Sequence, residues 1–210
     1  MSEPSAQLAI VRIVDDDASF LRAIARMLRG AGFQVKTFTS AAEFLADSEP
    51  DVPGCVLVDL QMPGLTGLDL QHELANAGNP LPLIFLSGHG DVPTTVHAMR
   101  GGAEDFLTKL APKSDLIDAV KRALARDAGQ RAEQARRKAR RAPFSRLTAR
   151  EMEVLQHVVA GKLNKQIAGD LDIHERTVKL HRTAITTKLG VQSTAELTRL
   201  WIEVQGFKED

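Results

Sequence analysis

The chain has 210 residues, of which 43% are hydrophobic and 26% are charged, as is typical of soluble globular proteins. This length allows one large domain or two small ones, at roughly 100–150 residues per domain. The sequence has no apolar run close to the ~20 residues of a membrane-spanning helix, no signal-peptide pattern and a single cysteine, Cys55. These features exclude a disulfide-linked or Cys-rich zinc domain, and we expect a cytoplasmic protein without a membrane partner.

The zero net charge conceals two halves of opposite sign. Residues 1–122 contain 10 Lys and Arg against 16 Asp and Glu, which gives a net charge of −6. Residues 123–210 contain 17 against 11, which gives +6. This division indicates two domains, and it makes the basic one a candidate for binding a polyanion.

The first 122 residues alternate between short apolar runs and amphipathic segments. The apolar runs are rich in Val, Ile, Leu and Phe, and they predict buried strands at 8–14, 34–38, 55–59, 81–87 and 105–108. The intervening segments predict helices at 19–28, 41–46, 67–77, 92–100 and 114–124. Five such units in series indicate a flavodoxin-like α/β fold with a doubly wound, five-stranded parallel sheet.

Residues 125–145 are expected to be a basic linker between one domain at 1–124 and another at 146–210. The stretch 123–146 has eight Lys or Arg against two acids and shows no apolar stripe. Its Ala, Arg, Gln and Glu residues favour a helix, which would continue the preceding one as an exposed rod. A flexible linker is an equal alternative, and Pro143 ends any helix that forms there.

From Leu147 onward the pattern is helical throughout. Thr148 and Glu151 predict a capping box that begins a helix reaching about residue 160. Further helices are predicted at 164–171 and 175–189, and Ser193 caps a last helix through about residue 204. The helices at 164–171 and 175–189 are separated by a three-residue break, so this all-α region resembles a helix-turn-helix.

Polar side chains stand at the carboxyl ends of four predicted strands, where an open parallel sheet forms its site. They are Asp15 and Asp16 after the first strand, Asp59 in the third, Ser87 in the fourth and Lys109 after the fifth. Converging carboxylates repel one another unless a hard cation such as Mg²⁺ neutralises them. A carboxylate beside Mg²⁺ can attack phosphorus and form an aspartyl phosphate, whose oxygens the lysine and the hydroxyl could bind.

The residues of this region resemble those of response-regulator receiver domains over 8–122. The matching stretches are IVDDD at 13–17, VDLQMPGLTGLDL at 58–70, LSGHGDVPTTVHAM at 86–99 and GAEDFLTK at 102–109. The resemblance implies that Asp59 is the phospho-acceptor. It implies a Mg²⁺ site made by Asp15, Asp16, Asp59 and the backbone carbonyl of Gln61.

The same resemblance assigns roles to three residues near the ends of the later strands. Ser87 and Phe106 match the two switch positions of the family, and Lys109 matches the lysine that contacts the phosphoryl group. One residue departs from the pattern, because Leu110 stands where the family normally has a proline after a cis bond. A cis bond before a residue other than proline costs about 2.5–4 kcal/mol, so we predict a trans Lys109–Leu110 bond, which could impair switching.

The C-terminal region closely resembles LuxR-type helix-turn-helix domains from residue 147 to about 200. The resemblance rests on matches that include Leu147-Thr148, Arg150-Glu151, Val154-Leu155, Gly161, Asn164-Lys165, Ile167-Ala168, Leu171, Thr177-Val178-Lys179, His181, Ile185 and Lys188-Leu189. Together with the receiver, it gives the architecture of a NarL/FixJ-type response regulator. The SGHGDVP loop is similar to the FixJ branch.

The recognition helix of such a motif lies in the major groove of DNA. On the predicted helix 175–189, Lys179 and Arg182 are the strongest candidates for base or phosphate contacts, and Arg176 and Thr183 share their polar side. Three further basic residues are expected to contact phosphates, namely Arg150, Lys165 and Lys188.

The joined resemblance implies a transcriptional regulator of a two-component system, controlled by phosphorylation, and not an enzyme. The implied partners are a sensor histidine kinase, double-stranded DNA, a second copy of the chain in the phosphorylated state, and RNA polymerase. Three alternatives stay open. They are a phosphorylation-independent regulator with a switch impaired by Leu110, a Mg²⁺-dependent phosphohydrolase, which lacks a second acid at Gln61, and an adaptor that binds protein.

Overall fold

The computed structural model describes residues 9–47, 52–79, 81–88 and 92–205. The chain divides into two compact units, and the boundary along the sequence lies between Arg131 and Ala132. Each unit has its own hydrophobic core, so each is described separately below. Within the described residues, no helix combines the length and apolar character needed to cross a membrane.

The first unit is built on a parallel sheet of five strands in the order β2-β1-β3-β4-β5. The strands are β1 (Ile10–Val14), β2 (Gln34–Phe38), β3 (Gly54–Asp59), β4 (Leu83–Ser87) and β5 (Asp105–Thr108). Every residue of β3 and β4 is buried, which explains why these strands read as unbroken apolar runs. The strand order is that of the flavodoxin-like fold, as expected.

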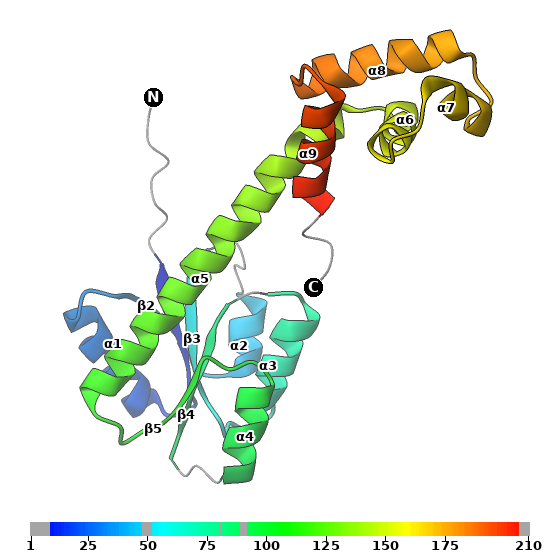
Figure 1. Ribbon diagram of the computed structural model, residues 1–210. Helices are drawn as coiled ribbons and strands as arrows, with labels where there is room; N and C mark the ends of the chain where they lie inside the picture. The colour runs from blue at the N-terminus through cyan, green and yellow to red at the C-terminus, as the bar shows by residue number, and fades with distance from the viewer. Residues whose placement is uncertain (1–8, 48–51, 80, 89–91, 206–210) are drawn as a thin grey trace. The chain divides into compact units, whose positions relative to one another are not determined.

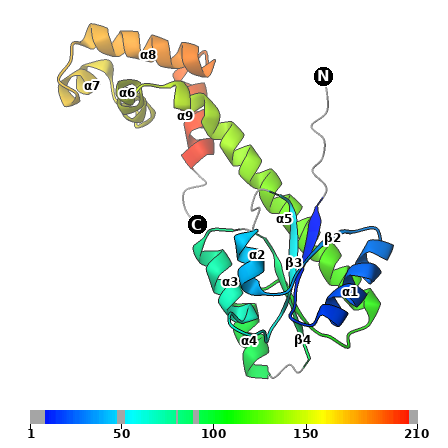
Figure 2. The ribbon, with the colours of Figure 1, turned by 180° about the vertical axis from the view of Figure 1, so that it is seen from behind.

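Helices cover both faces of this sheet (Figures 1 and 2). One face packs on α1 (Ala18–Gly30) and on the first half of α5 (Lys113–Arg141), and the other packs on α2 (Ala41–Ala46), α3 (Gly67–Asn76) and α4 (Val92–Arg100). Cys55 on β3 lies fully buried under α1 and α5, and this burial raises the pKa of its thiol to about 12. The doubly wound architecture predicted from the sequence is confirmed.

The predicted elements are present, and their bounds shift by a residue or two at some ends. The first strand begins at Ile10, and Leu8 of the predicted range lies outside the described residues. The fourth strand begins at Leu83 instead of residue 81, because Pro82 precedes it. Differences of this size are ordinary at element ends, where hydrogen bonding is incomplete.

The region expected to be a linker is helical, because α5 runs without a break for 29 residues to Arg141. Its residues 125–131 belong to the first unit, so this unit extends beyond the boundary expected at residue 124. The cause is Asp127, which the sequence pattern presents as one more surface charge but which is only 1% exposed.

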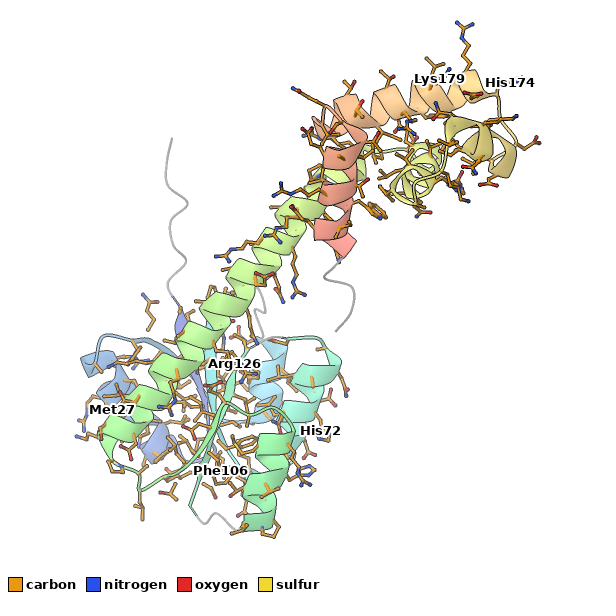
Figure 3. The ribbon with its side chains drawn as sticks, viewed as in Figure 1. Met27, His72, Phe106, Arg126, His174 and Lys179 are labelled. Carbon is orange, nitrogen blue, oxygen red and sulfur yellow. The ribbon has the colours of Figure 1, made fainter. Side chains whose placement is uncertain are left out.

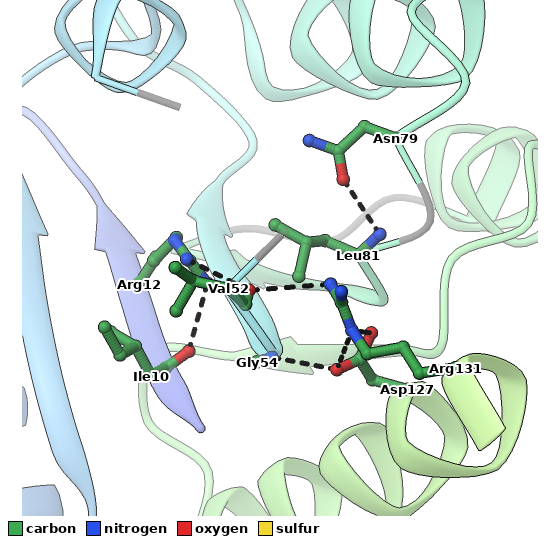
Figure 4. A network of polar contacts seen from close by, with 8 residues as sticks. All are labelled: Ile10, Arg12, Val52, Gly54, Asn79, Leu81, Asp127 and Arg131. Atoms are coloured by element: carbon green, nitrogen blue, oxygen red, sulfur yellow. Dashed lines mark hydrogen bonds and ion pairs between the residues drawn. The ribbon is translucent and has the colours of Figure 1, made fainter. Parts of the chain in front are cut away.

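Asp127 joins α5 to the amino-terminal edge of the sheet (Figure 4). Its carboxylate accepts a hydrogen bond from Gly54 N at 2.9 Å and pairs with Arg131 Nε at 2.9 Å. The Val52 carbonyl accepts hydrogen bonds from Arg131 and from the buried Arg12, at 3.5 and 3.3 Å. A Cβ at Gly54 would overlap the carbonyl of Ile10, so this edge requires glycine there.

The second unit is a small helical domain that includes a short 3₁₀ helix, η1 (Ala142–Arg146), directly after α5. Its helices are α6 (Ala149–Val159), α7 (Asn164–Asp170), α8 (Glu175–Leu189) and α9 (Thr194–Gln205). The capping box predicted for Thr148 and Glu151 is present. Phe144, expected in the linker, is instead a core residue of this unit, with its ring centroid 5.6 Å from that of Trp201.

We predict that Asp127→Ala destabilises the first unit by about 3 kcal/mol, because it breaks a buried ion pair whose arginine is partly exposed. The measurement is urea unfolding by circular dichroism, with Trp201 fluorescence identifying the transition of the second unit. Asp118→Ala on the same helix is the matched control, because Asp118 is 61% exposed and lies 3.9 Å from its partner Lys121. Equal stabilities of the two variants would contradict the role of Asp127.

Candidate functional site

Three carboxylates converge at the carboxyl edge of the sheet, as the sequence predicts. Asp15 and Asp16 follow β1, and Asp59 is the last residue of β3. One oxygen from each lies within 4.8 Å of the others. Since β1 and β3 are paired neighbours in the sheet, their ends deliver these groups to one place.

Lys109 lies between two of these carboxylates. Its Nζ is 2.6 Å from Asp15 Oδ2 and 3.0 Å from Asp59 Oδ2, and it also lies 4.7 Å from the ring centroid of Phe20. Burial lowers the pKa of Lys109, but the contacts in which its ammonium donates to the carboxylates of Asp15 and Asp59 outweigh burial, so the pKa is raised. The side chain is therefore a fixed positive charge at neutral pH.

Asp15 is the most buried of the three acids, with 1% exposure. Its Oδ1 accepts a hydrogen bond from Asp17 N at 2.9 Å. Its Oδ2 is buried and forms the ion pair with Lys109 Nζ at 2.6 Å. Burial raises the pKa of this carboxyl. Three carboxylate oxygens this close together, with one ammonium group beside them, fit a hard divalent cation such as Mg²⁺.

Local hydrogen bonds hold the loops that carry these acids. Asp17 caps α1 by accepting from Ser19 N and Phe20 N, and these backbone hydrogen bonds lower its pKa. Gly67 begins α3 directly against the carbonyl of Asp59, where a Cβ would overlap that oxygen. The loop after Asp59 therefore needs a glycine at this position.

The remaining receiver candidates lie on or beside the same edge. Ser87 ends β4, is 2% exposed, and accepts at its carbonyl a hydrogen bond from Lys109 N at 2.8 Å. Phe106 on β5, which is labelled in Figure 3, is half-buried. Its ring stacks on that of Phe85 with 6.0 Å between ring centroids. Gln61 is exposed, two residues after Asp59.

The peptide bond between Lys109 and Leu110 is trans, which confirms the prediction. The side chain of Leu110 is 91% exposed. In spite of this bond, Lys109 reaches both Asp15 and Asp59, so the loss of proline does not turn the lysine away from the acids.

The second unit presents a stripe of exposed side chains along α8. Arg176, Lys179 and Thr183 are exposed there, at helical spacings of three and four residues; Figure 3 labels Lys179. Leu180 lies in the same stripe and is 64% exposed. Nothing in the sequence marks Leu180 as a surface contact, because an apolar residue on a helix is normally a core residue, and only its exposure identifies it.

Other expected DNA contacts have partners within the second unit. Arg182 donates to Asn164 Oδ1 and Thr194 Oγ1, at 3.2 and 2.9 Å, and so ties α8 to the starts of α7 and α9. Lys188 contacts the buried carboxylate of Glu151 at 2.6 Å.

Two of the basic residues expected to contact DNA lie outside α8. Arg150 pairs with Glu153 and donates to the carbonyl of Leu171, whereas Lys165 is exposed on α7. The phosphate contacts expected of Arg150, Lys165 and Lys188 stay predictions, and the structure gives Arg150 and Lys188 an additional structural role.

Comparison with known proteins matches both units. Residues 11–121 match the response regulator receiver domain family, and residues 145–201 match the luxR family of bacterial regulatory proteins. Both are regulatory families and not enzyme families.

Relatives cover nearly the whole chain. Nodulation protein W of Bradyrhizobium diazoefficiens is 42% identical over 91% of this chain and 85% of its own length. The transcriptional regulatory protein FixJ of Rhizobium meliloti is 41% identical over 90% of this chain and 93% of its own.

Solved structures give the same result. The response regulator StyR is 41% identical with a TM-score of 0.79, over 93% of this chain and 99% of that one. Full-length FixJ from B. japonicum is 33% identical with a TM-score of 0.56, over 95% and 98%.

We predict that Glu151→Gln destabilises the second unit at pH 7 by about 1–2 kcal/mol, because it removes a charged partner of Lys188. Hydrogen bonding to Lys188 and to the backbone of Thr148 lowers the pKa of Glu151 below its ordinary 4.5. A lowered pKa stabilises the folded state above pH 4.5, and this contribution is lost as the pH falls through the lowered value.

The measurement is urea unfolding followed by Trp201 fluorescence, at pH 7 and at a series of pH values below 4.5. The difference between wild type and Glu151→Gln should shrink along this series. The matched control is Glu153→Gln on the same helix, because the Glu153 side chain is 50% exposed. A difference that stays constant with pH would contradict the assignment.

Proposed function

Because the chain belongs to the response regulators that join a receiver domain to a LuxR-type DNA-binding domain, we propose that phosphorylation of Asp59 controls its binding to DNA. The observation that carries this proposal is the position of Lys109, which bridges Asp15 and Asp59 beside Ser87. A nucleophile, two further acids and a fixed cation are the groups that phosphoryl transfer to a carboxylate needs.

In the proposed reaction, a carboxylate oxygen of Asp59 attacks the phosphorus of a phosphohistidine on the sensor kinase. An O–P bond forms, the P–N bond breaks, and its electron pair stays with the imidazole. Lys109 is placed to bind an oxygen of the transferred group while it remains in contact with Asp15. The hydroxyl of Ser87 is placed at the neighbouring strand end to donate to another oxygen.

Receiver domains in general hold Mg²⁺ at their acidic pocket. Here Asp15, Asp16, Asp59 and the Gln61 carbonyl would hold it, and the closeness of the three carboxylate oxygens, within 4.8 Å of one another, supports that assignment. When bound, Mg²⁺ supplies charge neutralisation for both the acids and the incoming phosphoryl oxygens.

The proposed switch links Ser87 to Phe106. Movement of Ser87 toward the phosphoryl group vacates space near β5, and Phe106 moves inward to fill it. Phe106 is half-buried and packs on Phe85, so an inward rotation exchanges exposed ring surface for buried surface. The α4–β5 face is thereby remodelled and becomes the surface on which two phosphorylated copies of the chain associate.

The proposed DNA-reading surface is the exposed stripe on α8. Arg176, Lys179 and Thr183 can reach base edges in the major groove, and Leu180 can contact the methyl group of a thymine. Arg182 is held by Asn164 and Thr194, which orients it for a phosphate contact. Arg150, Lys165 and Lys188 complete the proposed set of phosphate contacts.

We further propose that the protein works in the cytoplasm, with a sensor histidine kinase as phosphoryl donor and RNA polymerase as the partner at promoters. Leu110 favours a second candidate function, a regulator that binds DNA without phosphorylation. The side chain at this position is 91% exposed next to Lys109, where the family normally has a cis proline. The experiment below separates the two.

We expect beryllofluoride, which mimics a phosphoryl group on aspartate, to convert the wild-type protein from monomer to dimer in the presence of Mg²⁺. The measurement is molar mass by light scattering after gel filtration. Asp59→Ala should stay monomeric under the same conditions, and wild type without Mg²⁺ should do so too. If wild type binds DNA equally with and without beryllofluoride and does not change mass, the phosphorylation-independent function is the correct one.

We expect Lys179→Ala to weaken binding to a duplex selected from a random pool by about 1–3 kcal/mol, because it removes one side chain from the base-reading stripe. Binding to unselected DNA should weaken far less, so that the preference at one base pair relaxes. Lys121→Ala on α5 of the receiver is the control, with the same loss of charge at an exposed site. Equal weakening on both duplexes would assign Lys179 to phosphates instead.

A further inference from the structure

The end of α5 is an exposed, strongly basic helical segment. Every residue from 134 to 141 is exposed. Five of these eight residues are Arg or Lys, and none is acidic. They are Arg136, Arg137, Lys138, Arg140 and Arg141. Neither the receiver chemistry nor the recognition helix uses this segment.

The basic residues gather on one side of the helix. At 100° per residue, they occupy an arc of roughly 200°, and Ala135 and Ala139 lie on the opposite side. The segment therefore presents a basic face backed by two small residues, although it has no apolar stripe.

The charges of this face repel one another. Arg136 and Arg140 are four residues apart, as are Arg137 and Arg141, and like charges at this spacing destabilise a helix. Glu133, the one acid among residues 132–146, contacts Arg137 at 3.2 Å and Arg136 at 4.0 Å. Within residues 132–141 five cations stand against one carboxylate, so the segment's own formal charge is strongly positive.

The helix dipole explains only part of this charge. Basic residues in the last turn are favourable because they face the negative end of the dipole. That accounts for Lys138, Arg140 and Arg141, but Arg136 and Arg137 lie before the last turn. A helix that only faced solvent could carry Glu or Gln at positions 136 and 137, and this would avoid the repulsion between like charges.

We propose that residues 136–141 form a second DNA-contacting surface, which binds duplex phosphates without reading their sequence. This rests on the proposed DNA binding of the second unit. Phe144, three residues after Arg141, is buried in the core of that unit, so the basic face is tethered next to the DNA-binding domain. The segment spans about 8 Å along its axis, over which duplex DNA carries four to five charges at about 1.7 Å each.

The test compares the salt dependence of DNA binding in two charge-matched variants of the full chain. In the first, Arg136, Arg137, Lys138, Arg140 and Arg141 are each replaced by Gln, which keeps the helix propensity. In the second, the same replacement is made at five exposed basic residues of the receiver, namely Arg22, Arg26, Arg29, Arg100 and Lys121. Binding to a labelled 40-base-pair duplex of random sequence is measured by fluorescence anisotropy over a range of salt concentrations.

Each phosphate contact contributes about −0.9 to the slope of log K against log salt concentration. We expect the linker variant to reduce the magnitude of this slope by at least about 2 per protomer, and the receiver variant to leave it unchanged. The ratio of affinities for a selected duplex and the random duplex should stay the same in the linker variant. Circular dichroism at 222 nm should show equal helix content in all three proteins.

Three results would overturn the inference. The first is an unchanged slope in the linker variant, and the second is an equal change in the receiver variant, which would make the effect one of net charge. A rise in affinity would also overturn it, because the basic face would then bind the acidic receiver instead of DNA. If the wild-type chain binds no duplex at all, the proposed DNA-binding function is wrong as well. The wild-type measurement therefore distinguishes a failure of the proposed function from a failure of this inference alone.

Discussion

Three carboxylates whose oxygens lie within 4.8 Å of one another raise the free energy of a fold unless cations share their space. The first unit meets this constraint with Lys109, which spans Asp15 and Asp59 from the end of the fifth strand. Burial of Asp15 makes the repulsion stronger, since water no longer screens it. Three carboxylates share one lysine ammonium, so the site keeps an excess of negative charge and favours the binding of a further cation.

The sequence was sufficient to predict the elements and the site at this edge, because their signals are local. Buried strands read as apolar runs, and strand ends in a parallel sheet must meet, so Asp15, Asp59, Ser87 and Lys109 could be brought together on topology alone. The trans bond before Leu110 was also predictable, because its cost is set by residue type.

The residues that could not be predicted are those whose partners are distant in sequence. Asp127 lies 73 residues from Gly54, and no pattern in a basic segment marks one acid as buried. The helical pattern places Arg182 and Lys188 on the polar side of α8, which is expected to face DNA. It does not show that Arg182 also binds Asn164 and that Lys188 also pairs with Glu151 inside the second unit. Leu180 is apolar, so only its exposure of 64% separates it from the core side of α8. In the second unit, charge alone therefore does not separate groups that stabilise the fold from groups that face a partner.

Cys55 offers a consequence of a different kind. It is the chain's single thiol, it has no exposed surface in β3, and its raised pKa of about 12 leaves it without thiolate at neutral pH. Alkylating reagents react with the thiolate, so modification requires the receiver sheet to open. The rate of labelling then reports the opening free energy of one unit alone, even in a mixture with nucleic acid. Cys55 therefore serves as a built-in alkylation probe for the opening of the receiver.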